Sequence, residues 1–104
     1  MMHGVMATAA LPIDAQRDRS AAVARALADP KRLRVLENLA DGGERSVGDL
    51  SRCVECQVPN MSQHLAVLRS AGIVASRRKG STVLYRIADP KVIDLVGALQ
   101  RVAG

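Results

Sequence analysis

Residues 46–72 read SVGDLSRCVECQVPNMSQHLAVLRSAG, and this stretch decides the fold. Ser46 followed three residues later by Asp49 is the pattern of a capping box, which marks the start of a helix. Leu50 and Val54 then lie one helical turn apart on the side that faces the core. The first helix of this stretch is therefore short.

A second helix follows after a tight turn. Met61, Leu65 and Leu68 recur at helical spacing and predict one buried apolar stripe. The opposite face carries small, hydroxyl and amide side chains, which can bond base edges and let the backbone approach the major groove. Two such helices indicate a helix-turn-helix that reads duplex DNA. The residues expected to approach bases are Pro59, Asn60, Ser62 and Gln63.

Helical patterns flank this motif on both sides. Residues 15–28 form an Ala-rich helical pattern, and Asp29-Pro30 starts another that ends at Gly42-Gly43. The same Ala-Asp-Pro-Lys sequence returns at residues 88–91 and predicts the start of a last helix. The apolar stripe expected on that helix is Val92, Leu95, Val96 and Leu99.

Between the motif and the last helix the pattern becomes alternating. Residues 82–87 alternate as a half-buried strand does, and residues 73–78 should pair with them. Gly80 supplies the turn, next to the basic run Arg77-Arg78-Lys79. A basic hairpin beside a helix-turn-helix is a wing. The run can be a solvated turn, but its position favours binding to DNA phosphates.

These elements predict a mainly α fold with a small β-hairpin, a winged helix-turn-helix of about five helices plus a two-stranded wing. Residues 1–14 lack sustained periodicity and predict a disordered arm, whereas residues 15–104 should form the DNA-binding and dimerisation domain.

Composition favours a nucleic-acid partner. The 104-residue chain has a formal net charge of +5 and a pI near 10.0, which favour a polyanion. Tyr85 is the single aromatic residue, too few for the stacking platforms that grip single strands, so duplex DNA is the better partner. No apolar run approaches the ~20 residues of a membrane span, and the first residues lack a secretion signal. We therefore expect a soluble, cytoplasmic protein with no membrane partner.

Several short motifs resemble one family of regulators. They are Ala26-Leu27-Ala28-Asp29-Pro30-Lys31-Arg32-Leu33, Ser46-Val47-Gly48-Asp49-Leu50, Met61-Ser62-Gln63-His64-Leu65, Leu68-Arg69, Ala71-Gly72-Ile73-Val74 and Tyr85. Through them the chain resembles the ArsR/SmtB family of winged helix-turn-helix repressors. The resemblance implies a homodimer built through the first and last helices. It also implies that the dimer binds an imperfect palindrome in its own operon and is released by a metal, a metalloid or a thiol-reactive species.

The two commonest metal sites of that family are missing from this sequence. Members that bind metal at the start of the third helix resemble Cys-Val-Cys-Asp, where this chain has Ser46-Val47-Gly48-Asp49. Members that bind zinc between the final helices begin with Asp-x-His and continue with a later histidine. This chain has Asp89-Pro90-Lys91 and no histidine after it.

Cys53 and Cys56 form a Cys-x-x-Cys around the turn of the motif. Two thiols about one helical turn apart can chelate a thiophilic metal or metalloid ion, or join in a disulfide. A structural zinc needs four ligands, and the chain has only two Cys and two His. One interpretation makes Cys56 a small buried hydrophobe and Cys53 incidental. The other is a sensor of a thiophilic metal, a metalloid or reactive sulfur and oxygen species, which would distort the DNA-reading helix.

His64 and Arg69 complete the candidate site. His64 lies at the edge of the apolar stripe, where it is either a packed, hydrogen-bonded histidine or a DNA contact. Arg69 is expected to neutralise a phosphate, as is the wing. The candidate DNA contacts are Pro59, Asn60, Ser62, Gln63, His64, Arg69, Arg77, Arg78 and Lys79.

The sequence predicts a regulator and not an enzyme. It has no Gly-rich phosphate loop, no paired-carboxylate signal, and no strand-then-helix context around Cys53 for a redox enzyme. We therefore predict a sequence-specific repressor of its own operon, released by chemistry at Cys53 and Cys56. A winged-helix repressor without metal or thiol input, and a nucleoid-type protein without sequence preference, are the alternatives.

Overall fold

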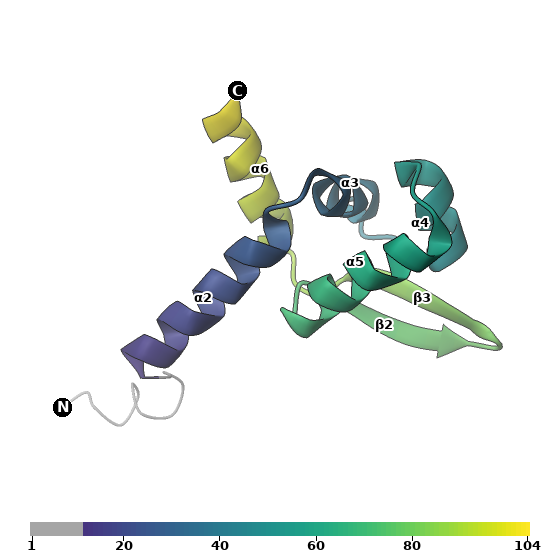
Figure 1. The fold of residues 1–104 in the computed structure, drawn as a ribbon, viewed down its shortest axis with the longest axis horizontal. Coiled ribbons are helices and arrows are strands. Elements are labelled where there is room, and N and C mark those ends of the chain that lie inside the picture. Colours follow the sequence, from purple (N-terminus) through teal and green to yellow (C-terminus); the bar gives the residue numbers. More distant parts are fainter. Residues whose placement is uncertain (1–11) are drawn as a thin grey trace.

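The computed structural model describes residues 12–104, with elements labelled as in Figure 1. In chain order they are α2 (Ile13–Leu27), α3 (Pro30–Leu39), β1 (Arg45–Ser46), α4 (Val47–Val54), α5 (Val58–Ser70), β2 (Val74–Lys79), β3 (Thr82–Ile87) and α6 (Lys91–Ala103). This order confirms the predicted winged helix-turn-helix, in which α4 and α5 are the two helices of the motif and β2 and β3 are the wing. None of the helices within residues 12–104 is both long and apolar enough to cross a bilayer.

The first helix starts earlier than the sequence suggested. α2 begins at Ile13 and not at Ala15, because Asp14 in the first turn and the bond from the N–H of Gln16 to the carbonyl of Pro12 extend the helix. The remainder of the expected arm, residues 1–11, lies outside the described residues.

Side chains cap the helices on either side of β1, as predicted. The Asp29 carboxylate accepts the backbone N–H groups of Lys31 and Arg32 at 2.8 and 3.1 Å. The Ser46 hydroxyl accepts the N–H of Asp49 at 3.1 Å. These bonds satisfy N–H groups that have no partner inside the helix, so the two starts are fixed by local sequence.

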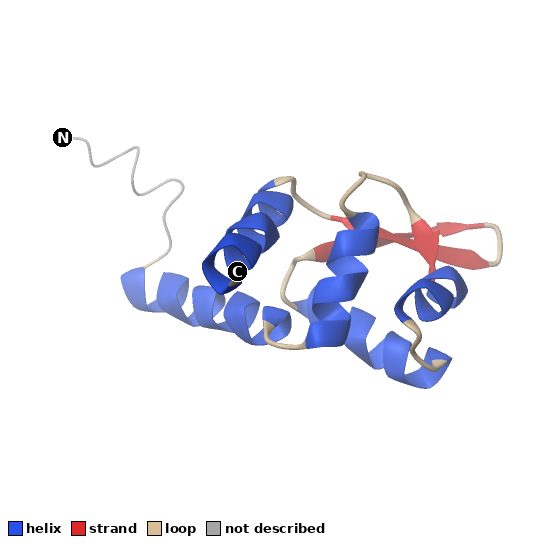
Figure 2. Ribbon diagram, turned by 90° about the horizontal axis from the view of Figure 1, so that it is seen from above, coloured by secondary structure: helices blue, strands red, loops and turns tan. Residues whose placement is uncertain are grey.

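The core forms where α3, α4 and α5 meet the wing. Met61, Leu65 and Leu68 are fully buried, which confirms the predicted stripe of α5. Figures 1 and 2 show these three helices gathered over the sheet, while α2 and α6 occupy the other end of the molecule. The buried core consists of Ala26, Leu27, Val35, Leu36, Leu39, Leu50, Val54, Met61, Leu65, Leu68, Ile73, Val74 and Val96.

The wing differs from the prediction in the length of its turn. β2 and β3 pair antiparallel down to Lys79 opposite Thr82, so Gly80 and Ser81 alone form the turn. Gly80 has a φ of 63°, the left-handed conformation that two-residue hairpins favour at this position. The basic residues 77–79 therefore lie in the strand and not in the loop.

A short third strand joins the wing. Arg45 and Ser46 form β1, which pairs antiparallel with β3 opposite Tyr85 and Leu84 and gives the sheet order β1-β3-β2. Two residues are too few to show an alternating pattern, so the sequence did not reveal this strand. It ties the start of α4 to the wing.

The last helix buries less of its apolar stripe than expected. Val96 is 7% exposed, whereas Leu95 and Leu99 are each 40% exposed. α6 packs on α3 with one edge and leaves the neighbouring edge uncovered beside α2.

Candidate nucleic-acid interface

The exposed face of α5 presents the side chains that the sequence assigned to base reading. Pro59, Asn60, Ser62 and Gln63 are all exposed, while the opposite stripe is buried. No side chain caps the start of α5, and its first turn contains no acidic residue. Free N–H groups and the positive end of the helix dipole suit this end of α5 to a phosphate-lined groove.

Two cationic side chains of α3 hydrogen-bond to the turn between α4 and α5, which sets the direction of α5. Nζ of Lys31 donates to the carbonyls of Val54 and Glu55 at 3.1 and 2.8 Å. Nη2 of Arg34 donates to the carbonyl of Cys53 at 3.0 Å. These donors satisfy the last carbonyls of α4 and complement its dipole. The sequence analysis missed this role, although both cations follow the Asp-Pro cap by a few residues.

Arg32 links α5 to the end of α2. Its side chain is 16% exposed and donates from Nε to the carbonyl of Ala26 at 2.6 Å and from Nη2 to that of Arg25 at 3.2 Å. Its Nη1 lies 3.2 Å from Nδ1 of His64, which must accept because a guanidinium only donates. His64 is thus half-buried and hydrogen-bonded at the core edge, the first of its two interpretations.

Strand alternation divides the basic run of the wing. Arg77 and Lys79 point to one face of the sheet, and Arg78 points to the other, on the side of the buried Val74. Tyr85 shares this second face and packs against the core. The expected single basic patch is therefore two groups, one on each face.

Arg77 is engaged by a carboxylate from the loop before β1. Its Nε and Nη2 donate to the two carboxylate oxygens of Glu44 at 2.6 and 2.7 Å. This hydrogen bonding holds the pKa of Glu44 below its usual value and raises that of Arg77. Within residues 12–104, Arg78, Lys79 and Arg86 are exposed and form no ion pair, so these three wing cations are available to phosphates.

Arg69 lies at the far end of α5. It is exposed in the last helical turn, where it lines a shallow hollow with Arg19 and Gly72. About 16 Å of helix separate it from Val58, so it would meet a different phosphate from those near the start of α5.

The two cysteines differ in their surroundings. α4 ends at Val54, and Glu55 adopts a left-handed conformation with a φ of 56°, so Cys53 and Cys56 are not neighbours on a continuous helical turn. Cys53 is exposed, whereas Cys56 is half-buried, packs against the core and has its Sγ 3.6 Å from the carbonyl of Gln57. The helical spacing assumed for the pair is thus wrong, because the left-handed residue interrupts the helix.

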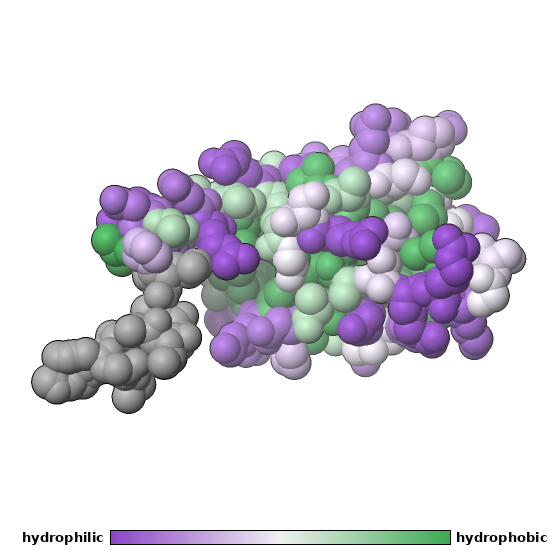
Figure 3. Space-filling model, turned by 90° about the horizontal axis from the view of Figure 1, so that it is seen from below, coloured by the Kyte–Doolittle hydropathy of each residue, from purple (hydrophilic) through white to green (hydrophobic). Residues whose placement is uncertain are grey.

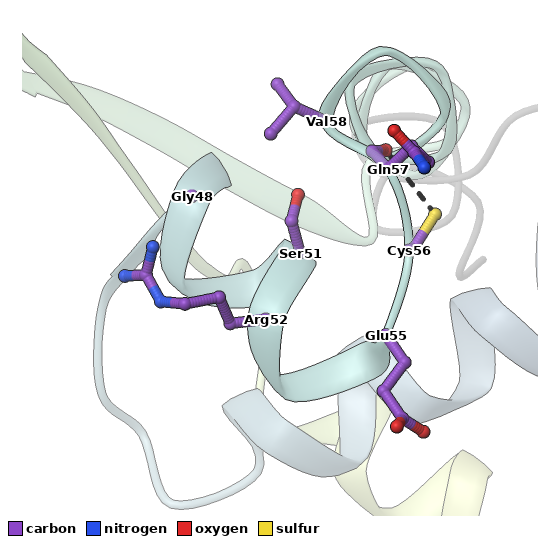
Figure 4. A pocket seen from close by; sticks show the side chains of 7 residues that line it. All are labelled: Gly48, Ser51, Arg52, Glu55, Cys56, Gln57 and Val58. Carbon is purple, nitrogen blue, oxygen red and sulfur yellow. Dashed lines mark hydrogen bonds between the residues drawn. The ribbon is translucent and has the colours of Figure 1, made fainter.

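Cys56 lines a hollow of about 440 Å³ between α4 and the start of α5 (Figure 4). The other lining residues are Gly48, Ser51, Arg52, Glu55, Gln57 and Val58. Cys53 is not among them. Within residues 12–104 no cluster of three or more His, Cys, Asp or Glu side chains could hold a metal ion. A thiophilic ion at either cysteine would need ligands from elsewhere.

The surface seen from below the view of Figure 1 is mixed. Figure 3 shows hydrophilic atoms dense at the right-hand end, and further hydrophilic groups set among apolar and intermediate atoms over the rest of the face. The right-hand end is the end of the wing (Figure 1). The wing thus offers a polar, basic surface beside the exposed face of α5.

Known proteins share this arrangement. A family model described as a helix-turn-helix domain matches residues 27–77. An uncharacterised HTH-type transcriptional regulator of Mycobacterium tuberculosis is 44% identical over 79 residues, which cover 75% of this chain and 68% of that protein. The biofilm growth-associated repressor of Agrobacterium fabrum is 41% identical over 92 residues, covering 86% and 78%.

Solved structures extend the similarity to the flanking helices. A homodimeric winged helix-turn-helix DNA-binding domain from Mycobacterium bovis, described as a possible ArsR-family transcriptional regulator, has a TM-score of 0.81. It is 36% identical in sequence, and the match covers 91% of this chain and 89% of that one.

Proposed function

This chain belongs to the ArsR family of winged helix-turn-helix DNA-binding regulators, and from that premise we propose that it is a homodimeric, sequence-specific repressor of its own operon. Members of this family are transcriptional regulators and not enzymes, as the sequence predicted. The proposed target is an imperfect palindrome in duplex DNA, and the proposed place of action is the cytoplasm.

The observation that carries the proposal is the uncapped, exposed start of α5 beside unpaired wing cations. Polar side chains of α5 can read base edges, while Arg78 and Lys79 can neutralise phosphates. Base contacts give sequence preference and phosphate contacts give affinity, so the two groups predict different effects of substitution.

Two substitutions separate these contributions. Gln63→Ala should relax the sequence preference with a modest loss of affinity, because it removes a base contact. Arg78→Ala should weaken binding to all duplexes alike and flatten the salt dependence. Fluorescence anisotropy on the upstream DNA and on a shuffled duplex measures both. Uniform losses from both variants would contradict sequence-specific repression and favour a nucleoid-type protein.

The uncovered faces of α2 and α6 support the dimer. Leu95 and Leu99, each 40% exposed, line an apolar hollow of about 500 Å³ with Val23 and Leu27. A second copy would remove this surface from water, which is the usual reason for an apolar patch on a small domain. Leu99→Glu should therefore produce a folded monomer with weak DNA binding in sedimentation and anisotropy experiments. A dimer that survives this substitution would place the interface elsewhere.

We assign derepression to chemistry at Cys53 and Cys56. Cys56 lies two residues before α5 and contacts Gln57, the N-cap residue, so a ligand or a bond at its sulfur would shift the start of the DNA-reading helix. A thiophilic metal, a metalloid or a reactive sulfur or oxygen species would act there, with further ligands from solvent or the partner protomer.

Single Cys53→Ser and Cys56→Ser variants test this assignment. The Cys56→Ser variant should no longer release DNA when arsenite, zinc or polysulfide is added to the protein–DNA complex. Without these reagents it should bind DNA with the affinity of the wild type. A double variant that still responds would exclude the thiols, and a wild type that responds to nothing would leave a repressor without thiol input.

A further inference from the structure

One large aliphatic side chain is exposed at the DNA-reading end of α5. Val58 is the first residue of this helix and is 51% exposed. Within residues 12–104, the other exposed large aliphatic residues lie on α2, α6 or the later turns of α5. They are Ile13, Val67, Leu95, Leu99 and Val102. Val58 is thus the exposed large aliphatic residue of the described chain that lies where α5 would meet bases.

About half of the Val58 side chain is accessible from outside. Figure 4 shows it projecting from the start of α5 on the side of Gly48, where it lines the same hollow as Cys56. A Cβ on Gly48 would meet only ordinary contacts, the nearest being Arg52 Nη1 at 3.6 Å. The fold thus does not require a glycine there, and its lack of a side chain keeps this part of the hollow that Val58 lines open.

The major groove offers one apolar group at its base edges, the C5 methyl of thymine. Ser62 lies four residues after Val58 and so on the same flank of α5, where its hydroxyl can bond a neighbouring base. We propose that Val58 packs against a thymine methyl in each half-site and makes that position of the operator specific for thymine. This inference rests on the proposed function, since it assumes that the start of α5 enters the major groove.

Replacing thymine by uracil removes only this methyl group. An operator is first selected from a pool of random duplexes, and each conserved thymine is then replaced in turn by uracil. For the wild-type protein, one thymine per half-site should be sensitive, with a loss of about fourfold per half-site, the effect of burying one methyl group. Replacement in both half-sites should cost on the order of fifteenfold.

Val58→Ala should bind the thymine and uracil forms of that position equally well. Val67→Ala is the matched control because it removes the same atoms from the same helix, where Val67 is 42% exposed and lines the groove between α5 and α2. It should keep the full sensitivity to uracil. Val58→Thr keeps the side-chain shape and one methyl group, so it should keep part of the sensitivity to uracil. Circular dichroism verifies that each variant is folded.

The inference is overturned if no uracil replacement weakens the wild type, or if Val58→Ala remains as sensitive as the wild type. These outcomes differ from a failure of the proposed function. A selection that yields no preferred sequence would contradict sequence-specific repression itself, whereas a clear operator without coupling to Val58 would contradict this inference alone.

Discussion

Neutralising Glu44 should strengthen DNA binding through the wing. In the free protein, Glu44 accepts both bonds from Arg77, so the charge of that arginine is compensated. Lys79 and Arg86 also act on Glu44 through their charges, which places the carboxylate on a cationic strand face. Glu44→Gln removes the negative charge and releases Arg77 to a phosphate.

The magnitude follows from counterion release. Each phosphate contact adds about 0.9 to the slope of log affinity against log salt concentration. A dimer gains two such contacts, so the slope should steepen by about 1.8. The advantage of the variant over the wild type should therefore be about tenfold larger at ~50 mM than at ~200 mM salt.

Fluorescence anisotropy on a random-sequence duplex isolates this electrostatic effect. Glu37→Gln is the matched control, because it makes the same charge change on α3 at a carboxylate that faces Gln100 of α6. Arg77→Ala should change the slope little in the wild type but should abolish the gain in the Glu44→Gln background. A substitution and not a change of pH is needed, because Arg77 lowers the pKa of Glu44 further below the neutral range, where the carboxylate is already ionised.

The reasoning would be refuted by a Glu44→Gln variant with an unchanged or flatter salt slope. Weaker binding would mean that the pair orders the wing for DNA. Arg77 would then contribute to DNA binding by positioning β2, and its pairing with Glu44 would not compete with a phosphate contact.

Three further substitutions test the supports of the interface. Asp29→Ala should lower the free energy of unfolding by about 1 kcal/mol at pH 7 through loss of the helix cap. Burial raises the pKa of Asp29, but the backbone N–H groups of Arg32 and Lys31 outweigh it and lower the pKa overall. The cap's contribution is thus complete above the ordinary pKa, and the difference from wild type should vanish in thermal melts as the pH falls through the lowered pKa. Arg32→Ala should cost about 2 to 3 kcal/mol in urea unfolding, because a charged donor to two helix-end carbonyls is lost. Glu55→Gly should be about 1 kcal/mol more stable than Glu55→Ala in the same assay, because alanine keeps the strain of the left-handed conformation and glycine does not. The two variants are matched, since both lack the ion pair of Glu55 with Arg34. Equal stabilities would argue against strain at this turn.

The parts of the fold that local chemistry dictates were predictable. The caps at Asp29 and Ser46 need only residues two or three positions away, and the stripe of Met61, Leu65 and Leu68 needs only helical periodicity. β1 was not predicted, because a two-residue strand is too short to show alternating hydrophobicity and because it pairs with β3, whose residues lie far along the chain.

The parts of the site that depend on distant residues were not predictable. The sequence gives no sign that Arg77 is paired, because its partner Glu44 lies 33 positions away. The hydrogen bond between His64 and Arg32 likewise joins residues 32 positions apart. The helical spacing assumed for the cysteines failed for a different reason. The sequence placed the turn of the motif around these residues, but it did not predict the left-handed conformation of Glu55, which is unusual for a residue with a side chain.

The most direct test of sequence-specific repression is the affinity of the purified dimer for the duplex upstream of its own gene, compared with a shuffled duplex of the same composition. Anisotropy titrations at physiological salt should give at least about a thousandfold preference for the upstream duplex. Equal affinities for the two duplexes would contradict the account.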